Sequence, residues 1–157
     1  MSAEMAVLRD DCDLVWLTLS GLERRGGDVL YDVHLMARDE PGEPPEPFLS
    51  GYGFREPIVG LAQLIDHLGE AVAGSLTALR HDPIADGLSI ELKLGGQGNP
   101  PQFEVVAWLD LTRTSRALKA RATRGRHQVG TRFFTDLGRL EEFRAGLIAL
   151  ANSAADQ

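Results

Sequence analysis

Apolar and polar residues alternate along several short segments of the chain, which is the pattern of strands that bury one face. The most regular segment is residues 88–94, where Leu88, Ile90, Leu92 and Leu94 share one side. Six other segments show a shorter or less regular alternation: 14–20, 29–37, 48–55, 76–81, 103–111 and 127–134. Gly26-Gly27 supplies the positive backbone angles of a tight hairpin turn between the first two.

Two longer segments change to the helical period, with apolar residues three and four positions apart. The first covers residues 57–73, and Pro57 suits the first turn of a helix. The second covers residues 136–152, where Thr135 or Asp136 can cap the helix. The order of elements predicts an α+β fold, with one antiparallel sheet of about six to seven strands packed against two amphipathic helices.

The chain length of 157 residues favours a single globular domain over residues 1–157, with an ordered core at about 12–152. Hydrophobic residues make up 43% of the chain, which is enough for a core that needs neither disulfides nor metal. The single cysteine, Cys12, cannot form an internal disulfide. With no long apolar run and no signal-peptide pattern, we expect a cytoplasmic protein that does not bind membranes.

Residues 39–47 contain four prolines and four acidic residues, and we expect them to form a stiff, exposed acidic loop. The acidic residues are Asp39, Glu40, Glu43 and Glu46. Stiff loops lose little entropy on docking, so these four side chains are candidates for contact with a cationic partner.

The net charge of −7 is unevenly distributed along the chain. An acidic surface repels nucleic acid, which is therefore a disfavoured partner. Residues 111–132 are nevertheless basic and contain no acidic residue. The candidate basic patch within them comprises Arg113, Arg116, Lys119, Arg121, Arg124 and Arg126. This segment is either a solvated hairpin or short helix, or a surface that holds an acidic protein or an RNA.

The sequence contains no recognisable catalytic motif. Gly96-Gln-Gly98 is followed by Asn-Pro-Pro, which fits a turn and not a dinucleotide site. The four histidines have no metal-ligand spacing, and three aspartates near Cys12 are too closely spaced for a calcium loop. Because nearby carboxylates raise the pKa of a thiol, we expect Cys12 to be passive. We therefore predict no catalytic, cofactor-binding or metal-binding residues, and no enzyme activity.

Two tryptophans, Trp16 and Trp108, are candidates either for packing beneath the helices or for anchoring a contact. Trp108 lies with Val106 on the second face of its strand, which is more apolar than a solvated face requires. A helix or a partner, including a second copy of the chain in a homodimer, would cover that face.

The chain resembles the immunity proteins of WapA-type contact-dependent toxins (the WapI type) and their small bacterial relatives, over roughly residues 12–151. The segments that carry the resemblance are 14–21 (LVWLTLSG), 31–33 (YDV), 48–54 (FLSGYGF), 74–79 (GSLTAL), 88–94 (LSIELKL), 103–109 (FEVVAWL) and 133–140 (FFTDLGRL) with Phe143. The resemblance implies the architecture, and a binding protein without catalytic residues.

Three functional hypotheses follow. The first is an immunity-type protein that neutralises a cationic toxin, encoded nearby, by direct contact. The second is a small-molecule-binding protein or enzyme with a pocket between a curved sheet and its helices, for which His34, Tyr52 and Asp32 are candidates. The third is a homo-oligomeric structural protein joined through Val106 and Trp108.

Overall fold

The structure is a computed structural model that describes residues 5–83, 87–95, 101–110 and 128–156. The described residues form eight strands and two helices. In chain order these are β1 (Met5–Arg9), β2 (Val15–Arg25), β3 (Asp28–Ala37), β4 (Glu46–Pro57), α1 (Ile58–Val72), β5 (Ala78–His81), β6 (Leu88–Leu94), β7 (Gln102–Asp110), β8 (Gln128–Asp136) and α3 (Leu137–Ala155). The predicted α+β class is confirmed.

The prediction of one sheet of six to seven strands is wrong. The strands form two four-stranded antiparallel sheets, which we name sheet A (β1-β2-β3-β4) and sheet B (β5-β6-β7-β8). Helix α1 begins directly after β4 and separates it from β5, so these consecutive strands do not pair. Alternation along a strand identifies its buried face but says nothing about its neighbours, and for that reason the sequence did not reveal the division.

The two sheets meet at the edge strands β1 and β8. The backbone N–H of Asp11 donates to the carbonyl of Phe134 over 2.8 Å, and the Thr135 hydroxyl donates to the carbonyl of Arg9 over 2.7 Å. Strand β1 was not predicted from the sequence, because only Ala6 and Leu8 show its alternation. Without this strand, the corner between the sheets could not be foreseen.

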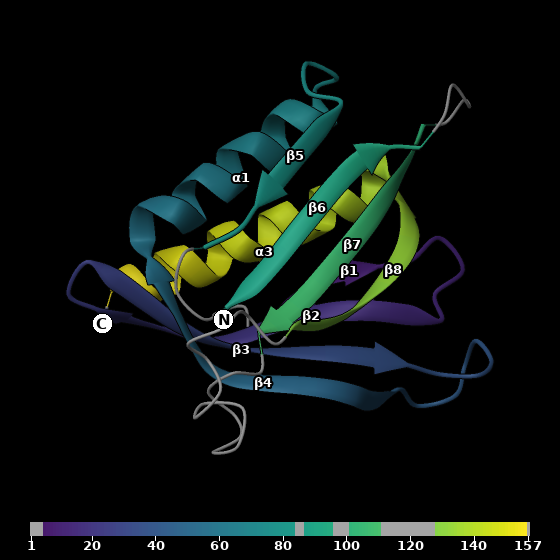
Figure 1. Cartoon of the computed structure of the whole chain (residues 1–157), viewed down its shortest axis with the longest axis horizontal. Coiled ribbons are helices and arrows are strands. Elements are labelled where there is room, and N and C mark those ends of the chain that lie inside the picture. Colours follow the sequence, from purple (N-terminus) through teal and green to yellow (C-terminus); the bar gives the residue numbers. More distant parts are fainter. Residues whose placement is uncertain (1–4, 84–86, 96–100, 111–127, 157) are drawn as a thin grey trace.

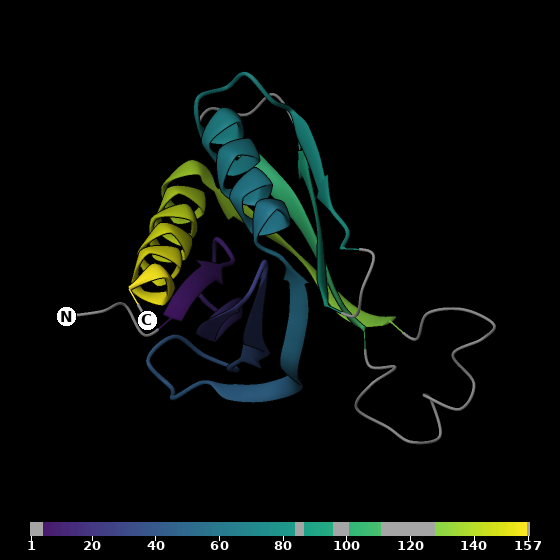
Figure 2. The same ribbon diagram turned by 90° about the vertical axis from the view of Figure 1, so that its left-hand side faces the viewer.

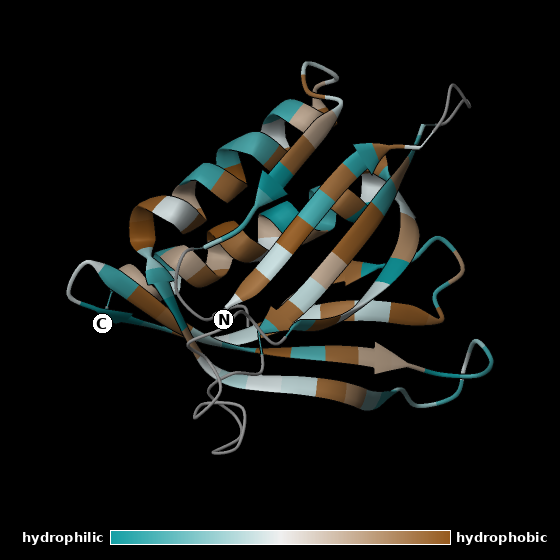
Figure 3. Cartoon of the chain, viewed as in Figure 1, coloured by the Kyte–Doolittle hydropathy of each residue, from teal (hydrophilic) through white to brown (hydrophobic). Residues whose placement is uncertain are grey.

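The two sheets and two helices enclose one core, and Figure 2 shows these elements arranged around a common interior. Helix α3 packs on β1 and β2 (Figure 1), and α1 lies between α3 and β5 in Figure 2. Apolar and polar positions alternate along β6 in Figure 3, as the sequence predicts. Leu17 and Val33 of sheet A, Val105 of sheet B and Phe143 of α3 are fully buried in this core.

Both helices agree with their predicted ranges to within a few residues. Pro57 is the N-cap of α1, and the Asp136 carboxylate caps α3 by accepting a hydrogen bond from the backbone N–H of Arg139. At Gly146 of α3, a Cβ would lie 2.9 Å from the Cα of Ala6, so glycine allows α3 to pack closely on β1. Neither of the described helices is long and apolar enough to cross a bilayer.

Candidate functional site

The acidic loop predicted at residues 39–47 joins β3 to β4, and Glu46 and Pro47 are already the first residues of β4. All four predicted acidic residues are exposed. Three of them line a hollow of about 390 Å³, which we name the acidic hollow. Its lining residues are Ala37, Arg38, Asp39, Glu43, Pro44, Glu46, Pro47 and Phe48. Glu40 is exposed on the same loop but does not line the hollow.

Arg38 holds the base of this loop against the rest of sheet A. Its Nε donates to the carbonyl of Asp13 over 2.7 Å, and its Nη1 donates to the carbonyl of Glu43 over 3.2 Å. The guanidinium also lies 5.1 Å from the centroid of the Trp16 ring. These contacts leave the carboxylates of Asp39, Glu43 and Glu46 outside the network that fixes the loop backbone, and thus available to solvent.

The outer face of sheet A continues from the acidic hollow and carries aromatic side chains. Phe48 is 51% exposed and Tyr52 is 65% exposed. The His34 ring packs edge-on against Tyr52 at 5.3 Å, and its Nδ1 lies 2.6 Å from the Ser50 hydroxyl. The Asp32 carboxylate accepts a hydrogen bond from the backbone N–H of Gly53.

The expectation that His34, Tyr52 and Asp32 line a pocket between the sheet and the helices is wrong. The three residues do lie close together, but on the outer face of sheet A, because their neighbours Val33 and Leu35 point into the core. The alternation along β3 could have excluded the pocket, since it already placed His34 and Asp32 outward.

Trp108 lies on the outer face of sheet B and is 37% exposed. Around it, Val106 is half-buried and Arg132 binds Glu104 over 2.9 Å. The described helices pack on the other face of the sheet, so neither of them covers Trp108. The predicted partner-binding residues therefore fall on two separate surfaces, the acidic hollow of sheet A and the outer face of sheet B.

The predicted basic patch, Arg113, Arg116, Lys119, Arg121, Arg124 and Arg126, lies outside the described residues. Its role stays a prediction. Arg132, the next basic residue, is described and is engaged at the sheet B surface by Glu104.

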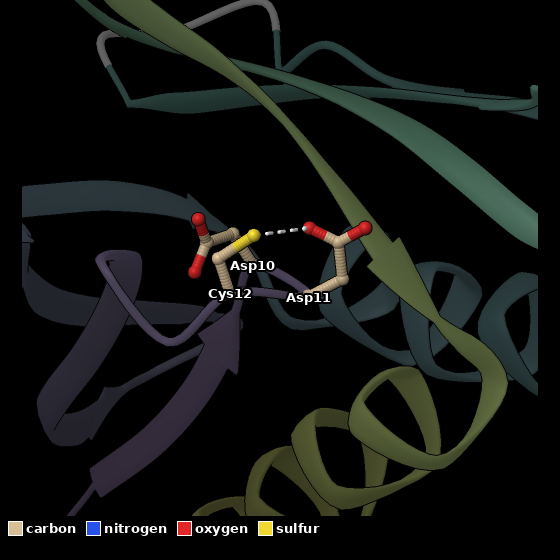
Figure 4. Close-up of side chains that lie close together, drawn as sticks. All are labelled: Asp10, Asp11 and Cys12. Carbon is tan, nitrogen blue, oxygen red and sulfur yellow. Dashed lines mark hydrogen bonds between the residues drawn. The ribbon is translucent and has the colours of Figure 1, made fainter. Parts of the chain in front are cut away.

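Asp10, Asp11 and Cys12 form a tight cluster at the turn after β1 (Figure 4), with their potential ligand atoms within 4.8 Å of one another. Asp10 accepts a hydrogen bond from the Leu14 backbone N–H, and Asp11 accepts one from the Gln102 side chain, each over 2.7 Å. The Cys12 thiol donates to Asp11, and this hydrogen bond, together with the nearby negative charge, raises the pKa of Cys12. The carboxylates thus stabilise the turn, and the thiolate form is disfavoured.

A second polar cluster, not predicted from the sequence, is buried at the end of β4. Glu56 points into the core and is only 2% exposed. The Tyr31 hydroxyl donates to its Oε2 over 2.5 Å. The Nε2 of His81 lies 3.0 Å from Oε1 and 3.1 Å from Oε2. The hydrogen bond is directed at Oε2, which leaves Oε1 without a hydrogen-bond donor among the described residues.

Burial and the neighbouring Glu56 carboxylate strongly raise the pKa of Tyr31, so its hydroxyl stays protonated and remains a donor. Buried carboxylates are costly unless they are hydrogen-bonded, and Glu56 accepts hydrogen bonds from Tyr31 and His81. The three residues come from β4, β3 and β5, and thus connect sheet A to sheet B.

A pocket of about 590 Å³ lies beside this cluster, between the first turns of α1 and the end of β5, and we name it the Glu56 pocket. Its lining residues are Glu56, Pro57, Val59, Gly60, Gln63, Leu64, His67, Arg80, His81, Asp82 and Pro83. The spacing of His67 and His81 in the sequence gives no indication that they share this pocket. The signal for Glu56 was its position two residues after the buried Phe54, on the same face of β4.

Comparison of the chain with known protein families finds no family that matches. A comparison with curated proteins finds no matching relative. The resemblance to WapA-type immunity proteins therefore stays a prediction.

Proposed function

We propose that the chain is a non-catalytic binding protein of the immunity type, which neutralises a cationic toxin by direct contact. The observation that carries the proposal is the acidic hollow, in which Asp39, Glu43 and Glu46 surround a space bordered by the exposed Phe48 ring. An interface needs an apolar anchor and complementary charge, and this hollow offers both.

The chemistry of the acidic hollow defines its partner. A lysine or arginine side chain that enters it can place its charge among the three carboxylates and its aliphatic stem against Phe48 and the prolines. The stiffness that Arg38 and the prolines give the loop lowers the entropy cost of docking. The net charge of −7 steers a basic protein toward this surface.

The experiment uses the purified product of the neighbouring open reading frame, titrated with the full chain at low and at high salt. Replacing Asp39, Glu43 and Glu46 by lysine should weaken binding about 100-fold, since each reversed contact costs roughly 1 kcal/mol. Added salt should weaken wild-type binding, because the charges at the rim are screened.

A matched control carries the same change of net charge on the helices. Asp66 and Glu70 of α1 and Glu141 of α3 are exposed, so their replacement by lysine tests overall charge without altering the loop. Equal affinity of the loop variant and the wild type would show that the acidic hollow does not contact the partner. Equal weakening by both variants would reduce the effect to net charge alone.

The outer face of sheet B supports a second candidate, a homodimer joined through Val106 and Trp108. The supporting observation is that Trp108, a residue type enriched at interfaces, is exposed on the face opposite the helices. Light scattering at high micromolar concentration tests it. A dimer that Trp108→Ser converts to a monomer is the expected result, and a monomeric wild type would overturn the candidate.

A further inference from the structure

The Glu56 pocket has a polar end whose hydrogen-bonding pattern can be derived from the groups present. Carboxylate oxygens only accept hydrogen bonds. Because Nε2 of His81 is hydrogen-bonded to Glu56, that nitrogen carries the proton. In a neutral imidazole the other nitrogen, Nδ1, is then an acceptor.

This Nδ1 atom is available to a ligand. The His81 side chain is 11% exposed and lines the Glu56 pocket. Its Nδ1 makes no hydrogen bond within the part of the chain that the structure describes. The arrangement is that of a histidine oriented by a buried carboxylate, with its second nitrogen directed away from that carboxylate.

Helix α1 leaves space in front of this histidine. A Cβ on Gly60 would lie 3.6 Å from Oε1 of Glu56 and 3.9 Å from Cε1 of His81, so the absent side chain opens this end of the pocket. Pro57, Val59 and Leu64 provide apolar walls, and Gln63 places a side-chain amide on the same helix. The volume of about 590 Å³ is within the usual range for small-molecule sites.

The charges and hydrogen-bonding groups around the pocket together favour an uncharged ligand. The buried Glu56 carboxylate and the net charge of the chain oppose an anion. Arg80, the one arginine among the lining residues, lies 3.4 Å from both Asp82 and Glu91, so its charge is already compensated. An ammonium group has no acceptor for a hydrogen bond from the Gln63 side chain, whereas a neutral amide can both donate to Nδ1 of His81 and accept from Gln63.

We propose that the Glu56 pocket binds a small, neutral molecule that carries a primary amide on a partly apolar body. The amide N–H donates to Nδ1 of His81, the amide carbonyl accepts from the Gln63 side chain, and the body lies against Pro57, Val59 and Leu64. This site is separate from the acidic hollow, and the inference does not depend on the immunity-type function.

Three probes with the same ring test the proposal by NMR titration of the ¹⁵N-labelled full chain: benzamide, benzoate and benzylamine. Benzamide should shift the resonances of the residues that line the Glu56 pocket, and should bind at least about tenfold more tightly than either charged analogue, a difference that one lost hydrogen bond explains. Equal or tighter binding of a charged analogue would overturn the proposal, as would shifts confined to other surfaces.

His81→Ala should abolish benzamide binding, whereas His67→Ala, which removes the other histidine of the pocket, should change it by less than about threefold. Loss of His81 leaves Glu56 buried with one partner fewer and can prevent folding. The ¹⁵N shifts of the wild-type His81 ring keep the test decisive in that case. An unprotonated Nδ1 at neutral pH is required, and a protonated Nδ1 would contradict the inference.

Discussion

The chain uses carboxylates in two opposite ways, at the Glu56 cluster and at the acidic hollow. Glu56 is buried, and its contacts with Tyr31 and His81 connect the two sheets. Asp39, Glu43 and Glu46 are exposed on a loop whose backbone is held by Arg38. The same functional group thus stabilises the fold at one site and is left exposed to solvent at the other.

The difference arises from the surroundings of the charge. A buried carboxylate that loses one partner is left in a medium that cannot solvate it, whereas an exposed one is solvated by water. Mutations at the Glu56 cluster should therefore change the free energy of unfolding, and mutations of the three carboxylates at the acidic hollow should change only binding. Four predictions test this contrast, from the largest expected effect to the smallest.

Replacement of Glu56 by alanine should lower the free energy of unfolding by about 2–6 kcal/mol, because it leaves the Tyr31 hydroxyl and the His81 Nε2–H buried without their acceptor, and each unsatisfied donor costs about 1–3 kcal/mol. Urea denaturation followed by circular dichroism measures this change. Glu46→Ala, at the exposed start of the same strand, is the matched control and should stay within about 0.5 kcal/mol of the wild type. Similar losses of unfolding free energy for both variants would contradict the difference between the buried and the exposed carboxylate.

Replacement of Tyr31 by phenylalanine should lower the free energy of unfolding by about 1–3 kcal/mol. The ring can still pack edge-on against Phe54, so the loss reports the hydroxyl that Glu56 accepts from. Tyr52→Phe removes an exposed hydroxyl from the same sheet and should leave the free energy of unfolding unchanged. A Tyr31→Phe variant with the same free energy of unfolding as the wild type would show that Glu56 does not need this donor.

Replacement of Arg38 by alanine should lower the free energy of unfolding by about 1–2 kcal/mol, since its two hydrogen bonds and its cation–π contact with Trp16 each contribute about 1 kcal/mol or less. Hydrogen exchange of the loop amides should accelerate far more than exchange in the core. Arg24→Ala, on the exposed end of β2, serves as the control. Unchanged exchange in the loop would mean that the prolines alone hold its shape.

Asp13 lies between the two extremes, because it is half-exposed and paired with Arg139 over 3.1 Å. The hydrogen bond from Arg139, reinforced by its charge, lowers the pKa of Asp13 below its ordinary value of 3.8. A carboxylate with a lowered folded-state pKa stabilises the fold above the unfolded-state pKa, and this contribution is lost as the pH falls through the folded-state value. Urea midpoints between pH 6 and pH 2.5 should fall less steeply for Asp13→Asn than for the wild type.

The sequence predicted the elements better than their assembly. Both helices follow from apolar stripes, since residues such as Leu61, Leu64 and Leu68 are buried at the positions that a helical period requires. The acidic loop follows from its prolines. The division into two sheets does not, because it depends on which strand edges meet, and no local pattern encodes that.

The candidate sites show the same limit. Exposure of Glu43 and Glu46 could be predicted from composition, but the hollow between them depends on Arg38 reaching Asp13, 25 residues away. Glu56 and His81 are likewise 25 residues apart and meet only because β4 and β5 flank α1. Contacts between distant parts of the chain create both sites, and a single sequence does not display them.

The contact between β1 and α3 has a consequence for the synthesis of the chain. Gly146 of α3 packs on Ala6. Just before α3, Thr135 of β8 donates a hydrogen bond to the carbonyl of Arg9, 126 positions away in the sequence. On the ribosome, β1 can pair with β2 early, yet its inner side stays uncovered until the last helix has emerged. During that interval, a chaperone that shields Ala6 and Leu8 would protect the nascent protein from aggregation.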